Sequence, residues 1–236
     1  MSIAENVKTV LEKLKQAALD AGRDPNEITL CAATKMNTAD RVRQAIAAGI
    51  TCCGENRVQE LTEKLAQNAY EGASIHFIGH LQTNKVKQVV GKVALIQSVD
   101  SLRLLEAIEK EACKQNIRQD ILLEVNLAGE ASKSGFSREE VYAVLEKMGD
   151  FSHIRVCGFM TIPPICHNPG ENDKIFQEMY NLSVDITAKK YDNVSVSTLS
   201  MGMSDDYADA IRCHSTMVRV GTAIFGARDY SKTNQN

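Results

Sequence analysis

The chain has 236 residues, and its 27 lysines and arginines against 30 aspartates and glutamates give a formal net charge of −3. This balance argues against a protein that binds nucleic acid by neutralising phosphates, and 44% hydrophobic residues with four prolines argue against disorder. No uncharged apolar stretch approaches the roughly 20 residues that span a bilayer, and residues 1–20 lack the apolar centre of a signal peptide.

The sequence opens with a segment of helical period. Its apolar residues recur mostly at three- and four-residue spacing, at Ile3, Val7, Val10, Leu11, Leu14 and Ala18. The dipeptide Asp24-Pro25 predicts that this helix has ended by residue 24. We therefore expect one amphipathic helix before the first strand.

After this helix, short β-rich runs alternate with longer amphipathic segments. The predicted strands are residues 28–34, 50–54, 75–79, 93–99, 121–127, 154–162, 193–201 and 217–226. The predicted helices between them are residues 39–48, 56–69, 82–91, 101–115, 137–148, 170–190 and 204–213. Strands that alternate with helices in this way indicate a parallel sheet.

Eight parallel strands are the number that closes a (β/α)8 TIM barrel, for which about 250 residues is the usual length. We therefore predict an α/β protein with a single barrel domain over residues 1–230, an extra N-terminal helix and a disordered tail at residues 231–236. An open, doubly wound sheet is the alternative. No G-x-G-x-x-G motif follows the first strand, where a dinucleotide-binding sheet would place one.

The cysteines indicate a reducing compartment. Their number is odd, they form no C-x-x-C pair, and most lie in apolar runs; they are Cys31, Cys52, Cys53, Cys113, Cys157, Cys166 and Cys213. We expect buried thiols without disulfides and a cytoplasmic location. The five histidines do not pair with cysteines at the spacing of a zinc site, so no metal site is predicted.

Lys35 is the first candidate for chemistry. Barrels of this kind place their sites at the C-terminal ends of the strands, and Lys35 directly follows the apolar or small residues 30–34. Its amine should emerge at the barrel mouth from a largely desolvated base. Burial lowers the pKa of lysine, and an unprotonated amine attacks an aldehyde to form a Schiff base. The alternative is a lysine that extends from a strand end into solvent.

The loops after the last two strands are candidates for binding a phosphate. Residues 200–204 read SMGMS, and Gly221 and Thr222 lie near the end of the eighth strand. Glycine lets the backbone approach a phosphate, hydroxyls donate to it, and a helix N-terminus adds partial positive charge. The two aspartates after SMGMS oppose this reading, and its last serine is explained equally well as a helix N-cap. Together with the lysine, these loops predict a ligand that carries an aldehyde and a phosphate.

Six longer segments are more specific than these single residues. They are IHFIGHLQTNKVKQVV at residues 75–90, with CAATKMN, CGENRVQE, GFMTIPP, LSMGMSDDYADAI and VRVGTAIFGAR elsewhere in the chain. Together they resemble the family of pyridoxal phosphate homeostasis proteins, over residues 28–228. The resemblance implies the barrel of bacterial alanine racemases without that enzyme's second, β-rich domain.

The resemblance also implies roles for individual residues. Lys35 matches the lysine that holds pyridoxal 5′-phosphate as a Schiff base, and Arg219 matches the arginine that faces the pyridine nitrogen. The other cofactor-binding residues that we predict are Ser200, Gly221 and Thr222 at the phosphate, Asn56 near the ring hydroxyl, and Met160 as apolar packing around the ring. No catalytic residue is predicted.

An arginine beside the ring nitrogen indicates a weak catalyst. Pyridoxal phosphate acts as an electron sink when a carboxylate keeps its ring nitrogen protonated, and an arginine is always charged and cannot do this. Racemases manage with the same arrangement, but they need acid–base groups on both faces of the substrate. Lys35 can serve one face. His80, at a strand end, is a candidate for the other face, although a loop histidine with a structural partner is the simpler explanation.

We therefore predict a non-catalytic protein that buffers or delivers pyridoxal phosphate and indirectly regulates amino-acid and keto-acid metabolism. Apo-enzymes that depend on this cofactor are its expected partners. We also expect a monomer, because the missing domain is where racemase-type dimers gain much of their contact. A racemase-like enzyme of weak activity is the alternative.

Overall fold

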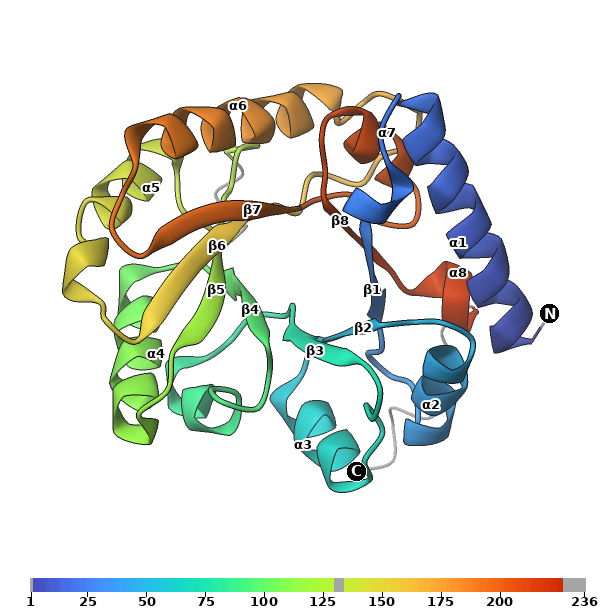
Figure 1. Ribbon diagram of the computed structural model, residues 1–236, viewed down its shortest axis with the longest axis horizontal. Helices are drawn as coiled ribbons and strands as arrows, with labels where there is room; N and C mark the ends of the chain where they lie inside the picture. Colours follow the sequence, from blue (N-terminus) through green and yellow to red (C-terminus); the bar gives the residue numbers. More distant parts are fainter. Residues whose placement is uncertain (1, 130–133, 227–236) are drawn as a thin grey trace.

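The structure is a computed structural model that describes residues 2–129 and 134–226. All its strand pairs are parallel, and β8 returns to pair with β1, so the sheet is a closed barrel. Figure 1 shows the strands as an inner ring surrounded by helices. The strands are β1 (Thr29–Ala33), β2 (Cys52–Glu55), β3 (Ser74–Phe77), β4 (Leu95–Val99), β5 (Gln119–Glu124), β6 (Ile154–Met160), β7 (Val194–Ser200) and β8 (Met217–Val220). The predicted (β/α)8 barrel is confirmed.

The helices of the outer ring follow the strands in the predicted order. The α-helices are α1 (Ile3–Asp20), α2 (Ala39–Ala47), α3 (Val58–Ala66), α4 (Leu102–Gln115), α5 (Arg138–Leu145), α6 (Asp173–Lys189), α7 (Tyr207–Arg212) and α8 (Thr222–Phe225). The 3-10 helices are η1 (Pro25–Glu27), η2 (Thr83–Gln88) and η3 (Met148–Asp150). No helix in the described part of the chain is both long enough and apolar enough to cross a membrane.

The predicted N-terminal helix is α1, which covers the barrel beside α8 (Figure 1). Ser2 begins it with a capping box: the Ser2 hydroxyl accepts from the Glu5 amide at 3.3 Å, and the Glu5 carboxylate accepts from the Ser2 amide at 2.7 Å. The apolar face of α1 is buried, and the side-chain amide of Asn6 donates to the carbonyl of Ile224 in α8 at 3.0 Å. The extra helix thus fixes the segment that follows β8.

Two predicted elements differ from the structure in type, and the others differ only at their ends. The eighth strand was predicted over residues 217–226, but β8 ends at Val220 and residues 222–225 form α8. Gly221 ends the strand (φ −120°, ψ −70°), and the apolar residues after it pack as a helical turn against α1. The predicted helix 82–91 is the shorter 3-10 helix η2. Its valines and those after it lower the α-helix propensity, because β-branched side chains lose freedom in a helix.

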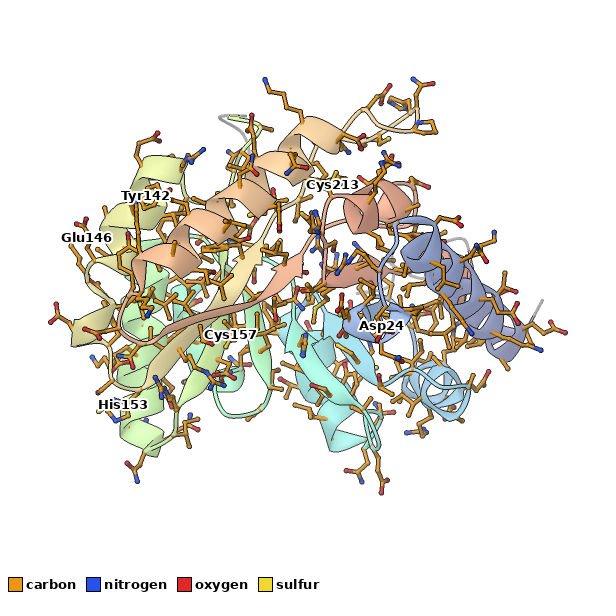
Figure 2. The ribbon with its side chains drawn as sticks, turned by 45° about the horizontal axis from the view of Figure 1, so that its top comes forward. Asp24, Tyr142, Glu146, His153, Cys157 and Cys213 are labelled. Atoms are coloured by element: carbon orange, nitrogen blue, oxygen red, sulfur yellow. The ribbon has the colours of Figure 1, made fainter. Side chains whose placement is uncertain are left out.

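The described residues form one large hydrophobic core and two smaller clusters. On β2, Cys53 belongs to the large core between strands and helices, whereas Cys52 packs with Cys31 and Met217 inside the barrel. Alternating residues of a strand point to opposite faces, which gives the adjacent cysteines different surroundings. Figure 2 shows side chains filling the space between the sheet and the helices. The predicted tail 231–236 and residues 227–230 lie outside the described residues.

Candidate functional site

A cavity of about 650 Å³ lies at the C-terminal ends of the strands. Its size is in the range of small-molecule sites, and its position is where barrel proteins place their functional residues. Five of the seven predicted cofactor-binding residues line it: Lys35, Asn56, Arg219, Gly221 and Thr222. These residues follow or end three different strands, so the fold brings together positions that are distant in the sequence.

Ser200 and Met160 do not line this cavity. Ser200 is fully buried; its hydroxyl donates to Gln97 Oε1 at 2.6 Å and accepts from Arg219 Nη1 at 2.6 Å. Met160 is fully buried in an apolar cluster with Leu95, Leu122 and Cys157. Direct contact of either residue with a cofactor stays a prediction, and the structure gives Ser200 an indirect position behind Arg219.

His80, the candidate for a second acid–base group, also lies outside the cavity lining. Its side chain is 62% exposed and its Nδ1 is 3.1 Å from Asp100 Oδ2. The two residues line a separate, shallow hollow at the start of η2 and α4. This arrangement matches the simpler explanation drawn from the sequence, namely a loop histidine with a structural partner.

The cavity is strongly cationic. Lys35, Arg41, Arg57 and Arg219 line it, against the single carboxylate of Glu60 among the described lining residues. An excess of positive charge in a concave site attracts anions. Sequence reasoning missed Arg41 and Arg57 as cavity residues. A signal was available, because Arg57 directly follows Asn56 at a strand end.

Arg41 also ties the cavity wall together. Its Nε donates to Asn37 Oδ1 at 2.9 Å, and its Nη2 donates to the carbonyl of Phe225 at the end of α8. Asn37 in turn donates from Nδ2 to the carbonyl of Lys35 at 3.0 Å. The backbone of the candidate lysine is therefore linked, through α2, to the segment that follows β8.

Arg219 is held rigidly at the base of the cavity. It is 6% exposed; Nη1 donates to the Ser200 carbonyl at 2.7 Å, and Nη2 donates to the Thr161 carbonyl at 2.8 Å. Burial lowers the pKa of Arg219. The Nε–H group has no hydrogen-bond partner among the described residues. Of the five N–H donors of the guanidinium, three are occupied, and the Nε–H and one Nη2–H are left for a ligand.

Asn56 offers a complementary acceptor. Its side-chain Oδ1 is buried, and within residues 2–129 and 134–226 it has no hydrogen-bond partner. Buried polar atoms are usually paired, so an orphaned acceptor in a cavity wall indicates a ligand that donates to it. Gly79 packs tightly on this residue, because a Cβ at position 79 would lie 2.1 Å from the Asn56 carbonyl oxygen. Any other residue at 79 would displace Asn56.

A buried ion pair positions the segment that carries Lys35. Glu55, at the end of β2, is fully buried, and its Oε2 accepts from Lys64 Nζ at 2.6 Å, Thr34 Oγ1 at 3.0 Å and Tyr70 Oη at 3.0 Å. Glu55 Oε1 accepts from the backbone amide of the next residue at 2.9 Å. One carboxylate therefore holds the ends of β1 and β2 together.

The same network continues on the other side of Lys35. Lys64 Nζ donates to the Thr34 carbonyl at 2.8 Å and to Glu60 Oε2 at 3.1 Å. Glu60 Oε2 also accepts from the backbone amide of Met36 at 2.7 Å. Met36 has φ +61°, a left-handed conformation that is unfavourable for a residue with a side chain. The neighbours of Lys35 on both sides are thus fixed by the ion pair, and sequence reasoning missed this network.

Glu124, at the end of β5, is a further group that the sequence did not reveal. It is 8% exposed, and burial, with a smaller contribution from Asp100, raises the pKa of its carboxyl to about 7. The charge of Arg219 acts in the opposite direction. Glu124 is therefore a carboxyl that titrates near neutral pH within the electrostatic reach of Arg219.

Comparisons with a family model and with curated proteins both match nearly the whole chain. The family model for the alanine racemase N-terminal domain matches residues 3–229. A curated pyridoxal phosphate homeostasis protein of Aquifex aeolicus (strain VF5) is 40% identical over 230 residues, which are 98% of this chain and 100% of that protein. The similarity therefore extends along nearly the whole of both chains.

Solved structures agree with the sequence comparison. PipY of Synechococcus elongatus, solved with PLP bound, superposes with a TM-score of 0.83 at 28% identity, covering 95% of this chain and 100% of PipY. A protein of unknown function from Bifidobacterium adolescentis has a TM-score of 0.88 at 36% identity, covering 94% of each chain.

The first prediction concerns the ion pair beneath Lys35. Substituting Lys64→Met leaves the Glu55 carboxylate buried without its cation, and we expect a loss of about 3–5 kcal/mol in the free energy of unfolding, measured with urea. Adding Glu55→Gln should recover part of the loss. Lys114→Met, at an exposed surface pair, should cost far less. A loss in Lys64→Met no larger than in Lys114→Met would contradict this role.

The second prediction concerns pH. Folded Glu124 keeps its proton up to about pH 7, whereas the unfolded chain loses it near pH 4.5, so stability falls as pH rises through this window. The loss is about 3 kcal/mol at most. Urea unfolding of wild type between these pH values should show a fall that Glu124→Gln lacks and that the exposed control Glu139→Gln retains. Identical profiles for wild type and Glu124→Gln would refute the assignment.

Proposed function

The chain belongs to the family of pyridoxal phosphate homeostasis proteins, and from this membership we propose that it binds pyridoxal 5′-phosphate in the cavity at the C-terminal ends of its strands. The observation that carries the proposal is the convergence of Lys35 and Arg219 on one cationic cavity. A solved relative with PLP bound in the same fold supports it.

The residues present fit this cofactor. When bound, pyridoxal phosphate supplies an aldehyde that condenses with an amine and releases water, and the Lys35 Nζ is the amine that would hold it. The Nε–H of Arg219 is a donor that suits an unprotonated ring nitrogen. The orphaned Oδ1 of Asn56 is an acceptor that suits the ring hydroxyl. The ring nitrogen would thus meet a hydrogen-bond donor, and the ring hydroxyl would meet an acceptor.

The phosphate would lie against the segment after β8. Gly221 and Thr222 line the cavity at the beginning of α8, and the first amides of a helix have no partner within it. A Cβ at residue 221 would lie 3.3 Å from the Ala33 carbonyl oxygen, which favours glycine there. Ser204, which also lines the cavity, offers a second hydroxyl. The arginines that line the cavity supply positive charge for the phosphate. Ser200 contributes indirectly, because its hydroxyl accepts a hydrogen bond from Arg219 and helps to hold that side chain in place.

The protein acts as a binder in pyridoxal phosphate homeostasis and not as an efficient enzyme. Proton transfer at an amino acid needs acid–base groups on two faces, and the described residues that line the cavity include no tyrosine, histidine or cysteine. The lining carboxylate of Glu60 is already bonded to Lys64 and to the Met36 amide. The arginine at the ring nitrogen adds to this effect, because it cannot protonate that nitrogen.

Buffering and delivery of the cofactor to apo-enzymes, with indirect effects on amino-acid and keto-acid metabolism, follow from such a role. The seven free cysteines support a cytoplasmic location. The apo-enzyme recipients and the monomeric state stay predictions.

The third prediction tests binding. Purified protein should be yellow, and borohydride should fix the cofactor on the peptide that contains Lys35, as read by mass spectrometry. Lys35→Arg keeps the positive charge but cannot form the bond, so it should give no reduced adduct, whereas the exposed control Lys85→Arg should match wild type. An undiminished adduct in Lys35→Arg would place the anchor on another lysine.

The fourth prediction separates a binder from an enzyme. In deuterated water, the loaded wild-type protein should exchange amino-acid α-protons far more slowly than the roughly 1–10³ s⁻¹ of ordinary enzymes. Nuclear magnetic resonance measures the exchange. The control is Lys35→Arg with the same total amount of cofactor. The exchange rate of wild type should be only slightly higher than the rate of this control. Turnover in the enzymatic range for any amino acid would establish the racemase-like alternative.

A further inference from the structure

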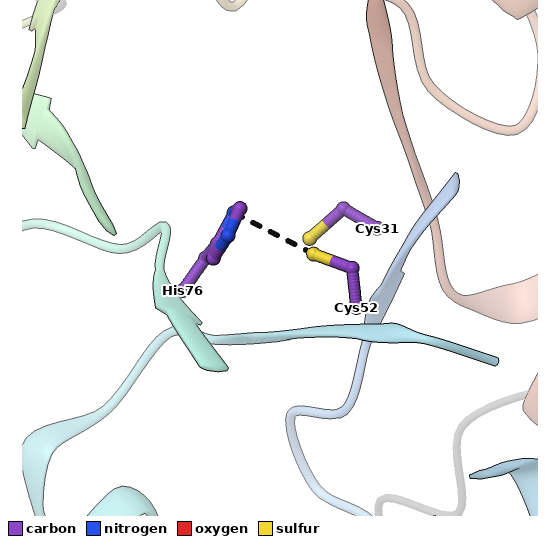
Figure 3. A group of neighbouring side chains, drawn as sticks. All are labelled: Cys31, Cys52 and His76. Carbon is purple, nitrogen blue, oxygen red and sulfur yellow. Dashed lines mark hydrogen bonds between the residues drawn. The ribbon is translucent and has the colours of Figure 1, made fainter. Parts of the chain in front are cut away.

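Three potential metal ligands meet inside the barrel, below the cavity. Cys31 of β1, Cys52 of β2 and His76 of β3 point toward one another from three adjacent strands (Figure 3). The two sulfur atoms and an imidazole nitrogen all lie within 4.8 Å of one another. The residues are 0%, 2% and 7% exposed. Cys31 lies in β1, four residues before Lys35 in the sequence.

The spacing of these atoms suits a tetrahedral ion. The distance from Cys52 Sγ to His76 Nδ1 is 3.5 Å. A zinc ion bound at about 2.3 Å from sulfur and about 2.0 Å from nitrogen would hold those two atoms roughly 3.5 Å apart. His76 is buried, and a neutral imidazole offers one ring nitrogen as a metal ligand.

Ligand chemistry favours zinc among the soft metal ions. Two cysteines and a histidine, with one further nitrogen or oxygen ligand, are a donor set typical of tetrahedral Zn²⁺. Two thiolates around Zn²⁺ also add no net charge to the barrel interior, where Ile78 and Met217 pack on the cysteines and the buried Arg219 is the β8 partner of Cys31.

We propose that Cys31, Cys52 and His76 form a binding site for one Zn²⁺ ion inside the barrel. Binding forms two Zn–S bonds and one Zn–N bond, and the two thiols release their protons to water. No sequence motif indicates this site, because its ligands come from three separate strands and lack the short spacings of zinc motifs.

Gln97 is placed to supply or support the fourth ligand. Its Nε2 lies 2.9 Å from His76 Nδ1, and its Oε1 accepts from the Ser200 hydroxyl at 2.6 Å. Turning the amide over presents its oxygen to the ion, while its nitrogen donates to the same serine hydroxyl, which can also accept. The ion therefore replaces the Gln97–His76 hydrogen bond without leaving Gln97 unpaired.

The experiment is equilibrium dialysis of the reduced, full-length protein against Zn²⁺, with the metal measured by mass spectrometry. Wild type should hold one zinc per chain, and Cys52→Ala should lose at least tenfold in affinity. Cys53→Ala is the matched control, because it makes the same change on the same strand in the outer core. It should bind as wild type does, as should Cys113→Ala at an exposed thiol. Circular dichroism checks that each variant is folded.

A second measurement needs no variant. Zinc X-ray absorption of the loaded wild-type protein should show two sulfur ligands and nitrogen or oxygen in the remaining positions. An ion held by oxygen and nitrogen alone, equal zinc affinity in Cys52→Ala and wild type, or binding of Cu⁺ without Zn²⁺ would each overturn the proposal. Lys35→Arg should keep full zinc binding, so failure of this site and failure of the cofactor site are distinguishable.

Discussion

The buried ion pair between Glu55 and Lys64 is the interaction on which the candidate site depends. A carboxylate without solvent contact is stable only when its lone pairs are occupied, and here a cation, two hydroxyls and a backbone amide occupy them. Because those partners come from the ends of β1 and β2 and from α3, satisfying the carboxylate also fixes the geometry of the strand ends. Lys35 emerges from the segment that is held in this way.

A second polar path runs through the interior of the barrel. Arg219 bonds the Ser200 hydroxyl, Ser200 bonds Gln97, and Gln97 bonds His76. This path connects the cavity with the cluster of cysteines below it. Polar side chains in a barrel interior are stable only when each has a partner, so the chain of hydrogen bonds explains why these residues lie together.

The residues around the cavity describe a site built to hold an anion, with little provision for moving protons. Its charge comes from three arginines and a lysine, and the guanidinium nearest the strands is locked by carbonyl oxygens. Its carboxylate is committed to structure. The arginines among these groups keep their positive charge near neutral pH, so they can bind an anion but do not act as proton donors or acceptors there.

The sequence by itself determined the repeat of strands and helices, the barrel, and the strand-end positions of Lys35, Asn56 and Arg219. These follow from periodicity and from short motifs, which are local properties of the chain. It misjudged the end of β8, where a β-rich run forms a helical turn because α1 covers it. Only the tertiary structure decided which polar residues face one another. Ser200 faces Arg219 and Gln97, Lys64 reaches Glu55, and Cys52 joins its partners inside the barrel because closure of the sheet sets their register. That register depends on pairing between separate strands, so no single segment of the sequence shows which of these residues meet.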